Sequence, residues 1–410
     1  MRWVLVALVL ALKSLYIEVM IWPFIFLSYA SLFVFGLSDN IRGPLFPEIM
    51  KQFAISDSMG SLMFALSNIS GFFASYGCRY LLRRYDRLTV LRGGAMGLTI
   101  SMWGMAASTY FPLFLFFSFF FGLSLGVLGL VPNILVPMGS SPHRKQQMLS
   151  GLHTMYGMAS LLAPLLAASM EYLTGSWRWT FVAGSIGPLS LLVYTLHGSH
   201  KSLHTKAEFS PEKHKANKQK NFKPQLFLAV MLSLAVAAEI MVSSRLALYM
   251  QRTWNYDMEA SSLYVTYFFI SMMLGRFLFT VVHFKRSPQF LLSASLILTA
   301  VFILAGVFVH PLFLAASGFM IAPFYPLSIS WISSEFPEDL DSAVSYMMAT
   351  DSLMLIIMHL TVGKLTDLFS IKQAILWGLA FVILSFFMVN GFAFLFKRER
   401  QGALQEVPAK

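Results

Sequence analysis

The chain has 410 residues, of which 57% are hydrophobic and only 12% are charged, and its net charge is +11. Soluble domains contain about 45–50% apolar and about 25% charged residues, so this composition excludes an ordinary soluble globule and indicates a protein of the lipid bilayer. The single cysteine, Cys78, excludes an internal disulfide framework. No zinc-binding or nucleotide-binding motif occurs, so we expect no metal, no cofactor, no nucleic-acid partner and no enzymatic activity.

The N-terminus opens with a short apolar stretch, residues 3–12, which ends at Lys13. A helix that spans a bilayer needs about 20 mostly apolar residues, so this stretch is too short to cross. It also lacks the small-residue cleavage site of a signal peptide. We expect residues 1–20 to be an N-terminal extension, either peripheral to the membrane or upstream of a translation start at Met20.

Twelve apolar runs follow, and each is long enough to cross the membrane as a helix. They cover residues 21–48, 58–78, 89–109, 112–138, 147–171, 179–197, 225–250, 260–283, 289–309, 311–333, 342–362 and 373–396. They predict an all-α membrane protein with an N-terminal six-helix bundle (21–197) and a C-terminal six-helix bundle (225–396). The Lys-rich segment 198–224 between the bundles is predicted to be a flexible cytoplasmic linker, and residues 397–410 a cytoplasmic tail.

The positive charges are distributed unevenly over the loops between these runs. The even-numbered loops and the C-terminal tail hold 20 Lys and Arg, whereas the odd-numbered loops hold 5. Cytoplasmic loops carry the excess of Lys and Arg, so we expect the even-numbered loops and both termini to be cytoplasmic. The prediction is a multi-pass protein of the inner (plasma) membrane.

Two of the runs indicate that the two bundles are distant copies of each other. The fourth contains GLSLGVLGLVPNILVPMG (122–139) and the tenth GFMIAPFYPLSISWISSEF (318–336). Each begins with glycine and continues with two prolines at nearly the same depth, which favours a pseudo-symmetric pair of bundles. Within the fourth run, Gly122, Gly126 and Gly129 have the spacing of close helix packing.

Three acidic residues lie inside predicted membrane helices: Asp39, Glu239 and Asp351. A charge at the bilayer centre costs about 2.5–3.5 kcal/mol, so such residues face a bundle interior or a wet cavity. We interpret all three as candidates for proton coupling. The alternative for Asp39 is a structural ion pair with Arg42, three residues further on, and the alternative for Glu239 is a carboxyl group held by hydrogen bonds between helices.

Other polar side chains in the runs are candidates for contact with a polar solute. They are Asn40, Arg42, Asn68, Asn133, His153, Tyr156, Tyr325 and His359, with Trp331 as a ring on which a sugar could stack. For each, the alternative is packing between helices. Arg42 is either the counter-ion of Asp39 or an anchor for an anionic or hydroxylated solute, whereas Arg245 is expected to extend toward the outer surface. Gly43, Pro44 and Pro47 predict a kink or an unwound turn in the first helix.

The twelve helices, the basic central loop and the Arg-rich second loop, RYLLRRYDRLTVL, resemble the major facilitator superfamily. The loop is similar to that superfamily's signature, G-x-x-x-D-R-x-G-R-R. Arg83 stands where the signature has Asp, and Asp86 stands where it has its second Gly. The resemblance implies that Arg83, Arg84, Asp86 and Arg87 form a gating loop.

Within the superfamily, several segments are similar to the fucose:proton symporter group and its sugar-transporting relatives. They are LSDNIRGPLFPEI, LVPNILVPMG, LSGLHTMYGMASLLAPLL, AVAAEIMVSSRLALYMQ, LGRF and GFMIAPFYP. In that group a Glu of the fourth helix pairs with the Asp of the first. The matching position here is near Gly129, so Glu239 or Asp351 would have to supply the second carboxylate.

This resemblance implies a secondary active transporter that takes up a sugar-like or other small polar metabolite by alternating access. The expected coupling ion is the proton, with sodium as a second choice, and the expected state is a monomer. The alternative on the same fold is a proton-driven exporter of drugs or metabolites. A more remote alternative is a membrane sensor or scaffold that does not transport.

Overall fold

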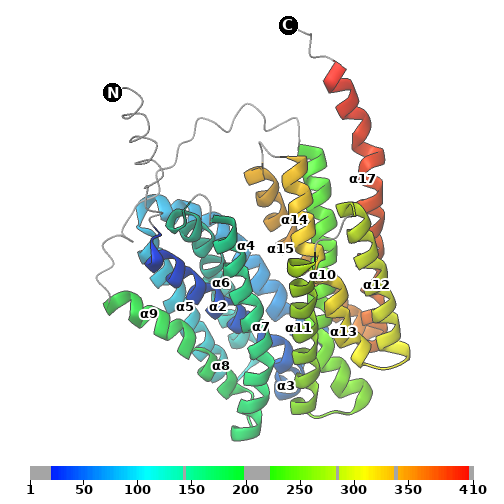
Figure 1. The fold of residues 1–410 in the computed structure, drawn as a ribbon. Helices are drawn as coiled ribbons and strands as arrows, with labels where there is room; N and C mark the ends of the chain where they lie inside the picture. Colours follow the sequence, from blue (N-terminus) through cyan, green and yellow to red (C-terminus); the bar gives the residue numbers. More distant parts are fainter. Residues whose placement is uncertain (1–19, 142–144, 198–221, 283–285, 337–339, 406–410) are drawn as a thin grey trace, which may run out of the picture.

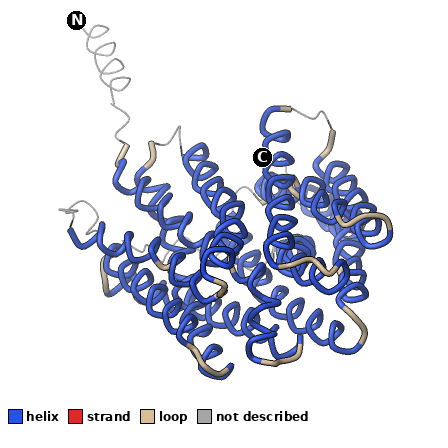
Figure 2. Tube along the Cα trace, turned by 90° about the horizontal axis from the view of Figure 1, so that it is seen from below, coloured by secondary structure: helices blue, strands red, loops and turns tan. Residues whose placement is uncertain are grey.

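The computed structural model describes residues 20–141, 145–197, 222–282, 286–336 and 340–405, and these residues form helices and short connections without a strand (Figure 2). All twelve predicted runs are helical. The predicted extension up to residue 19, most of the linker (198–221) and the end of the tail (406–410) lie outside the described residues.

The helices form two groups that stand side by side in Figure 1. The N-terminal group comprises α2 (Trp22–Asn40), α3 (Arg42–Phe53), α4 (Asp57–Arg84), α5 (Arg87–Ala107), α6 (Phe111–Gly139), α7 (Lys145–Thr174), α8 (Arg178–Gly184) and α9 (Ile186–His197). The C-terminal group comprises α10 (Phe222–Trp254), α11 (Met258–Val281), α12 (Pro288–Phe308), α13 (Leu312–Ile321), α14 (Phe324–Glu335), α15 (Leu340–Leu368), α16 (Ile371–Trp377) and α17 (Leu379–Gln405). Four of the predicted runs are therefore interrupted, as α2/α3, α8/α9, α13/α14 and α16/α17.

Ten helical stretches of the described residues are long and apolar enough to cross a membrane. The remaining two runs, α4 and α5, have 28 and 21 residues, which is sufficient length, but Ser, Gly and Arg make them less apolar. Several helices continue past their predicted ends. The clearest case is α17, which runs to Gln405 although its apolar part ends at Phe396, because helical hydrogen bonds extend beyond the hydrocarbon region into polar sequence.

The predicted repeat is visible in how the glycine-led helices pack. A Cβ atom on Gly122 of α6 would collide with the backbone oxygen of Ser67 in α4, and one on Gly318 of α13 would lie 2.5 Å from the backbone oxygen of Phe268 in α11. The hydrogen bonds also correspond, because Ser67 Oγ donates to Ser118 O over 3.0 Å, as Ser271 Oγ donates to Ala315 O over 2.7 Å. The α4/α6 and α11/α13 pairs are thus built alike, as two copies of one bundle would be.

The two groups meet along four pairs of helices: α4 with α15, α7 with α11, α3 with α10, and α3 with α11. At the end of this interface where α4 begins, Arg252 NH1 contacts Asp57 Oδ2 at 2.7 Å. The Asp367 carboxylate accepts hydrogen bonds from the backbone N–H groups of Asp57 (2.7 Å) and Ser58 (3.0 Å). These contacts join the groups at the end opposite Arg84, where α4 enters the Arg-rich loop.

Candidate functional site

The site begins at Ile41, where the first membrane run is interrupted between α2 and α3. Pro44 and Pro47 have no N–H group, so the carbonyl oxygens of Asn40 and Gly43 receive no helical hydrogen bond from them. The chain turns without unwinding, because Ile41 N still donates to Leu37 O (3.2 Å) and Leu45 N to Ile41 O (3.3 Å). The predicted break is present as a short turn beside polar side chains, where two carbonyl oxygens receive no hydrogen bond from the prolines.

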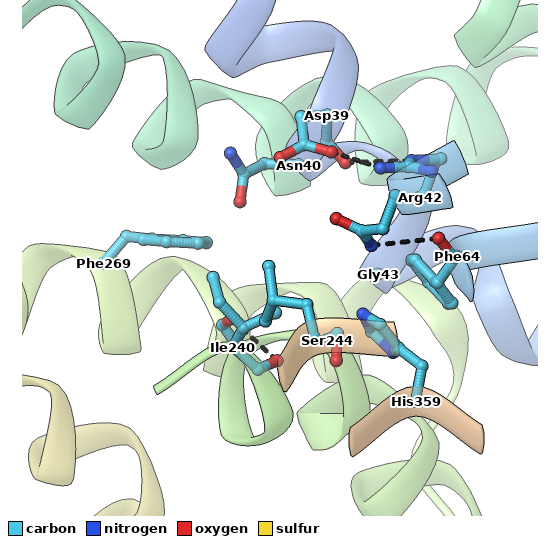
Figure 3. Close-up of a pocket in the computed structure, with 12 residues that line it drawn as sticks. Asp39, Asn40, Arg42, Gly43, Phe64, Ile240, Ser244, Phe269 and His359 are labelled. Atoms are coloured by element: carbon cyan, nitrogen blue, oxygen red, sulfur yellow. Dashed lines mark hydrogen bonds and ion pairs between the residues drawn. The ribbon is translucent and has the colours of Figure 1, made fainter. Parts of the chain in front are cut away.

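A pocket of about 60 Å³ lies next to this turn, between the two groups of helices (Figure 3). Its N-terminal wall consists of Asp39, Asn40, Arg42, Gly43, Phe64 and Asn68, and its C-terminal wall of Ile240, Ser243, Ser244, Phe269, Leu355 and His359. The pocket in this state therefore has room for only a few water molecules. Alternating access predicts a binding site at this position, where both groups contribute side chains.

Asp39 and Arg42 form an ion pair across the turn. The Arg42 side chain is 4% exposed and that of Asp39 is 28% exposed. The guanidinium carbon of Arg42 also lies 4.8 Å from the ring centre of Phe121 and 5.2 Å from that of Phe64. Aromatic faces attract a cation in a dry environment, so Arg42 is held between its carboxylate partner and two rings, while Asp39 faces the pocket.

The other Asp39 oxygen and Asn40 connect the pocket to α7. The Tyr156 hydroxyl lies 3.5 Å from Asp39 Oδ2. Asn40 Nδ2 lies 3.2 Å from the same hydroxyl and 2.9 Å from Ser160 Oγ. The structure therefore brings three of the predicted site residues, Asp39, Asn40 and Tyr156, into one hydrogen-bonded group.

Arg245 is the clearest error of the sequence analysis, because it does not extend to the surface. It is 1% exposed, and its NH2 atom lies 2.9 Å from Ser61 Oγ and 3.4 Å from His359 Nδ1. The guanidinium carbon is 4.1 Å from the ring centre of Phe46. Extension to lipid headgroups requires a lipid-facing helix, but α10 packs against both groups. The His359 ring is stacked on Phe64 at 4.5 Å.

Glu239 and Asp351 belong to a second polar cluster in the C-terminal group. Glu239 Oε1 pairs with Arg276 NH2 of α11 at 3.6 Å, and Asp351 Oδ1 accepts a hydrogen bond of 2.7 Å from Ser233 Oγ. The charges of Glu239, Asp351 and Arg276 all act on the Tyr325 hydroxyl. Arg276 was missed because its segment, LGRF, was considered only for its family resemblance. A charge in a membrane run was itself the signal that should have identified it.

The remaining predicted residues lie in more ordinary environments. Asn68 lines the pocket, yet its Nδ2 donates to Phe64 O of its own helix over 2.9 Å. Asn133 Nδ2 makes the equivalent bond to Gly129 O over 2.7 Å. His153 is exposed, near the charge of Arg276. Trp331 is 2% exposed and packs on Phe392, so in this state it has no free ring face for a sugar.

The predicted gating loop lies at the junction of α4 and α5. Asp86 caps α5, because its Oδ1 accepts the backbone N–H of Thr89 over 2.8 Å and its Oδ2 accepts the Thr89 hydroxyl over 2.8 Å. Arg84 stands over the ring of Tyr80 at 4.9 Å. Arg87 is buried, and the side chain of Arg83 lies outside the described residues. Asp86 thus has a helix-capping role in this structure.

Known proteins share this architecture. A curated relative, a TsgA homolog from Buchnera aphidicola subsp. Acyrthosiphon pisum (strain APS), is 25% identical over 230 residues, which are 52% of this chain and 58% of the relative. The match thus spans little more than half of that relative's length. The solved D-xylose-proton symporter gives a TM-score of 0.71 at 16% identity, over 90% of this chain and 97% of that one. FucP in the outward conformation gives 0.63 at 15% identity, over 90% and 98%.

These distant structural likenesses establish the fold alone, and the family assignment comes from the sequence. The model of the Major Facilitator Superfamily matches residues 28–340 and 228–410, which together cover both groups of helices. With twelve helical runs, two similar bundles and a polar pocket between them, the chain belongs to the major facilitator superfamily of membrane transporters.

Proposed function

We propose that this transporter takes up a small polar solute, sugar-like or another metabolite, together with protons. The observation that carries the proposal is the placement of Asp39 inside the membrane. It faces the pocket between the bundles and is paired with an almost completely buried arginine. A carboxylate in this position is kept for function in most membrane proteins, because its insertion is costly. The solved xylose-proton symporter supports the proton as the coupling ion by analogy of fold.

The ion pair offers a direct coupling mechanism. When Asp39 is ionised, it neutralises Arg42, and the pair can remain in a partly dry pocket. When Asp39 binds a proton, Arg42 loses its counter-charge, and its donors become available to oxygen atoms of a solute. Protonation of Asp39 and binding of the solute at Arg42 are then coupled, as symport requires.

Alternating access would proceed by rocking of the two bundles about the pocket. The cross-bundle contacts of Asp57, Arg252 and Asp367 close one end of the interface in this structure. The charge distribution of the loops supports the proposal that this end faces outside and that the termini are cytoplasmic. In this proposal the structure represents a state closed to the outside, and opening requires these contacts to break.

The test is proton movement in liposomes that contain the purified protein and an internal pH indicator. Sugars, amino acids and organic acids are added one at a time outside. We expect one class to produce internal acidification that a protonophore abolishes. If no solute in any class moves protons, while a sodium gradient drives uptake of one of them, proton coupling is wrong and sodium takes its place.

One observation favours export as a second candidate function. The pocket wall includes four large apolar side chains, Ile240, Leu355, Phe64 and Phe269, which would suit a solute less polar than a sugar. An exporter would acidify the compartment from which the solute leaves. The same liposomes distinguish the two readings when the solute is loaded inside and the proton gradient is directed inward.

A further inference from the structure

Among the described residues around the pocket, Arg245 is a buried cation without a carboxylate partner. Arg42 has Asp39 as its partner, and Arg252 has Asp57. Arg245, which is 1% exposed, forms an ion pair with no carboxylate of the described residues. Asp57, whose charge acts on Arg245, is already paired with Arg252. A buried charge is normally paired, so Arg245 is the feature that requires an explanation.

The hydrogen-bond donors of Arg245 are also incompletely used. Its NH2 atom reaches Ser61 Oγ at 2.9 Å, but Nε and NH1 have no hydrogen-bond partner among the described residues. The Nη1 atom of Arg42 likewise has no hydrogen-bond partner among the described residues. Buried donors are nearly always satisfied in folded proteins. Each bundle thus contributes one arginine with unused N–H donors. Such a pair is suited to bind a ligand whose oxygen atoms accept hydrogen bonds.

The two arginines lie against the same residue of the pocket wall, Phe64. The guanidinium carbons of Arg42 and Arg245 each lie 5.2 Å from the ring centre of Phe64. His359 is stacked on that ring, lines the pocket and lies 3.4 Å from Arg245. Figure 3 shows Arg42, Phe64 and His359 on the same side of the pocket. Arg245 therefore lies directly behind the pocket wall, and its contacts with Ser61 cross from one bundle to the other.

We propose that Arg42 and Arg245 form a carboxylate-binding subsite, and that the transported solute is a small organic acid. This inference rests on the proposed function and specifies its solute. When the outer end is open, α3 and α4 separate from α10, and Arg245 becomes accessible from the outside. A carboxylate that enters between the arginines supplies the missing counter-charge, and its two oxygens match the guanidinium donors. Closure over Arg245 is then favourable with the anion present.

The inference predicts a charge balance that differs from that of a sugar symporter. A solute with one negative charge that enters with one proton carries no net charge across the membrane. A neutral solute that enters with one proton carries one positive charge. Uptake of an organic acid should therefore respond to the pH gradient and be insensitive to a potassium diffusion potential, whereas uptake of a neutral sugar would be accelerated by a negative interior.

The experiment compares galacturonate and lactate with galactose, which matches galacturonate but lacks the carboxylate. The readouts are the thermal stabilisation of the purified protein and the uptake of each compound by liposomes. We expect the acids to raise the melting temperature and galactose to have no effect. Arg245→Gln should weaken binding of the acids on the order of 100-fold, because it removes one of two buried partners, and Arg245→Lys should retain part of the effect.

Arg286→Gln is the matched control, since it removes a positive charge at an exposed loop. Its stabilisation by the acids should equal that of the wild type. The melting temperature without solute shows whether each variant is folded. The proposal is overturned if the acids leave the melting temperature unchanged, or if galactose stabilises as strongly as galacturonate. Proton-coupled uptake of galactose would overturn the carboxylate subsite but support the proposed function. Binding of the acids without proton movement would support the subsite but contradict proton-coupled uptake.

Discussion

Asp39 contacts an arginine and a tyrosine, and these two contacts make its two predicted roles, proton coupling and an ion pair with Arg42, compatible. One carboxylate oxygen meets the Arg42 guanidinium, and the other lies 3.5 Å from the Tyr156 hydroxyl. An ionised carboxylate satisfies Arg42, whereas a protonated one can donate to an oxygen such as that of Tyr156. The ion pair and proton binding can therefore alternate during a transport cycle, so a structural pair at this position is not evidence against coupling.

The first prediction concerns Asp39→Asn. An amide has nearly the size of the carboxyl group but cannot bind and release a proton. We therefore expect the variant to lose accumulation of the solute against its gradient while exchange of labelled for unlabelled solute remains measurable. Both quantities are obtained from the same liposomes, with and without an imposed pH gradient.

The control for this substitution is Asp257→Asn. Asp257 caps α11 by accepting the backbone N–H of Ala260 over 2.8 Å, outside the predicted membrane runs, and Asn is equally suited to that position. It should transport like the wild type. Accumulation at the wild-type level in Asp39→Asn would show that Asp39 serves only the ion pair with Arg42.

The second prediction concerns the Glu239–Arg276 pair. Its members are 3.6 Å apart, with side chains 13% and 32% exposed. Glu239→Gln removes the negative charge of this pair and should lower the melting temperature. Adding Arg276→Gln should recover part of the loss, with a coupling energy on the order of 1 kcal/mol for a pair in contact. Purely additive effects of the two substitutions would show that the pair contributes nothing.

At the scale of elements, closure of the interface at the end where α4 begins depends on the contact of α15 with the start of α4. Asp367 accepts the N–H groups of Asp57 and Ser58, which are among the free donors at the N-terminus of α4. A carboxylate is also favourable there because of the helix dipole. One bundle thus caps a helix of the other, and the bond is lost whenever the bundles separate at this end.

The third prediction concerns Gly363, which lets α15 approach α4 closely. A Cβ atom there would lie 2.7 Å from Ser61 Cβ and 2.8 Å from Asp57 O. Gly363→Ala should therefore oppose closure of the outer end and increase the population that is open to the outside. A thiol reagent applied from the outside should label a cysteine placed at Asn68, in the pocket, faster than it does without the alanine.

Gly391→Ala is the control, because a Cβ atom at Gly391 meets nothing within 4 Å. It should leave the labelling rate unchanged. Equal rates in the two alanine variants would mean that the α4/α15 contact does not limit opening of the outer end.

Hydropathy and proline were sufficient to predict the twelve helical runs and the break near Ile41, because each depends on neighbouring residues, but they did not predict the breaks α8/α9, α13/α14 and α16/α17. The contacts of the outer closure were not predictable in this way. Asp57, Arg252 and Asp367 come from loops or helix ends far apart in the sequence, where charged residues are common and no periodicity relates them. The direction of the Arg245 side chain likewise depends on which helices pack around α10. The sequence of that one apolar run does not specify its neighbours.

At the scale of the whole molecule, the interface has chemically different ends. The end described by Asp57, Arg252 and Asp367 holds paired charges, whereas the Arg-rich loop after α4 lies at the other end. By the positive-inside rule, the Arg-rich loop predicts that its end of the interface is cytoplasmic. Opening of that end requires the pair of Arg252, 43% exposed, with Asp57, 8% exposed, to break.

The last prediction tests this orientation, on which the direction of the closure depends. Cys78 is completely buried, so Cys78→Ser provides a thiol-free background with little change at the surface. In it, Tyr256→Cys lies between α10 and α11, and Arg286→Cys lies between α11 and α12. A membrane-impermeant thiol reagent added to intact cells should label the cysteine at position 256. The cysteine at position 286 should be labelled only after the membrane is permeabilised. The reverse pattern would place the Asp57 contacts at the cytoplasmic end, and the structure would then represent a state closed to the inside.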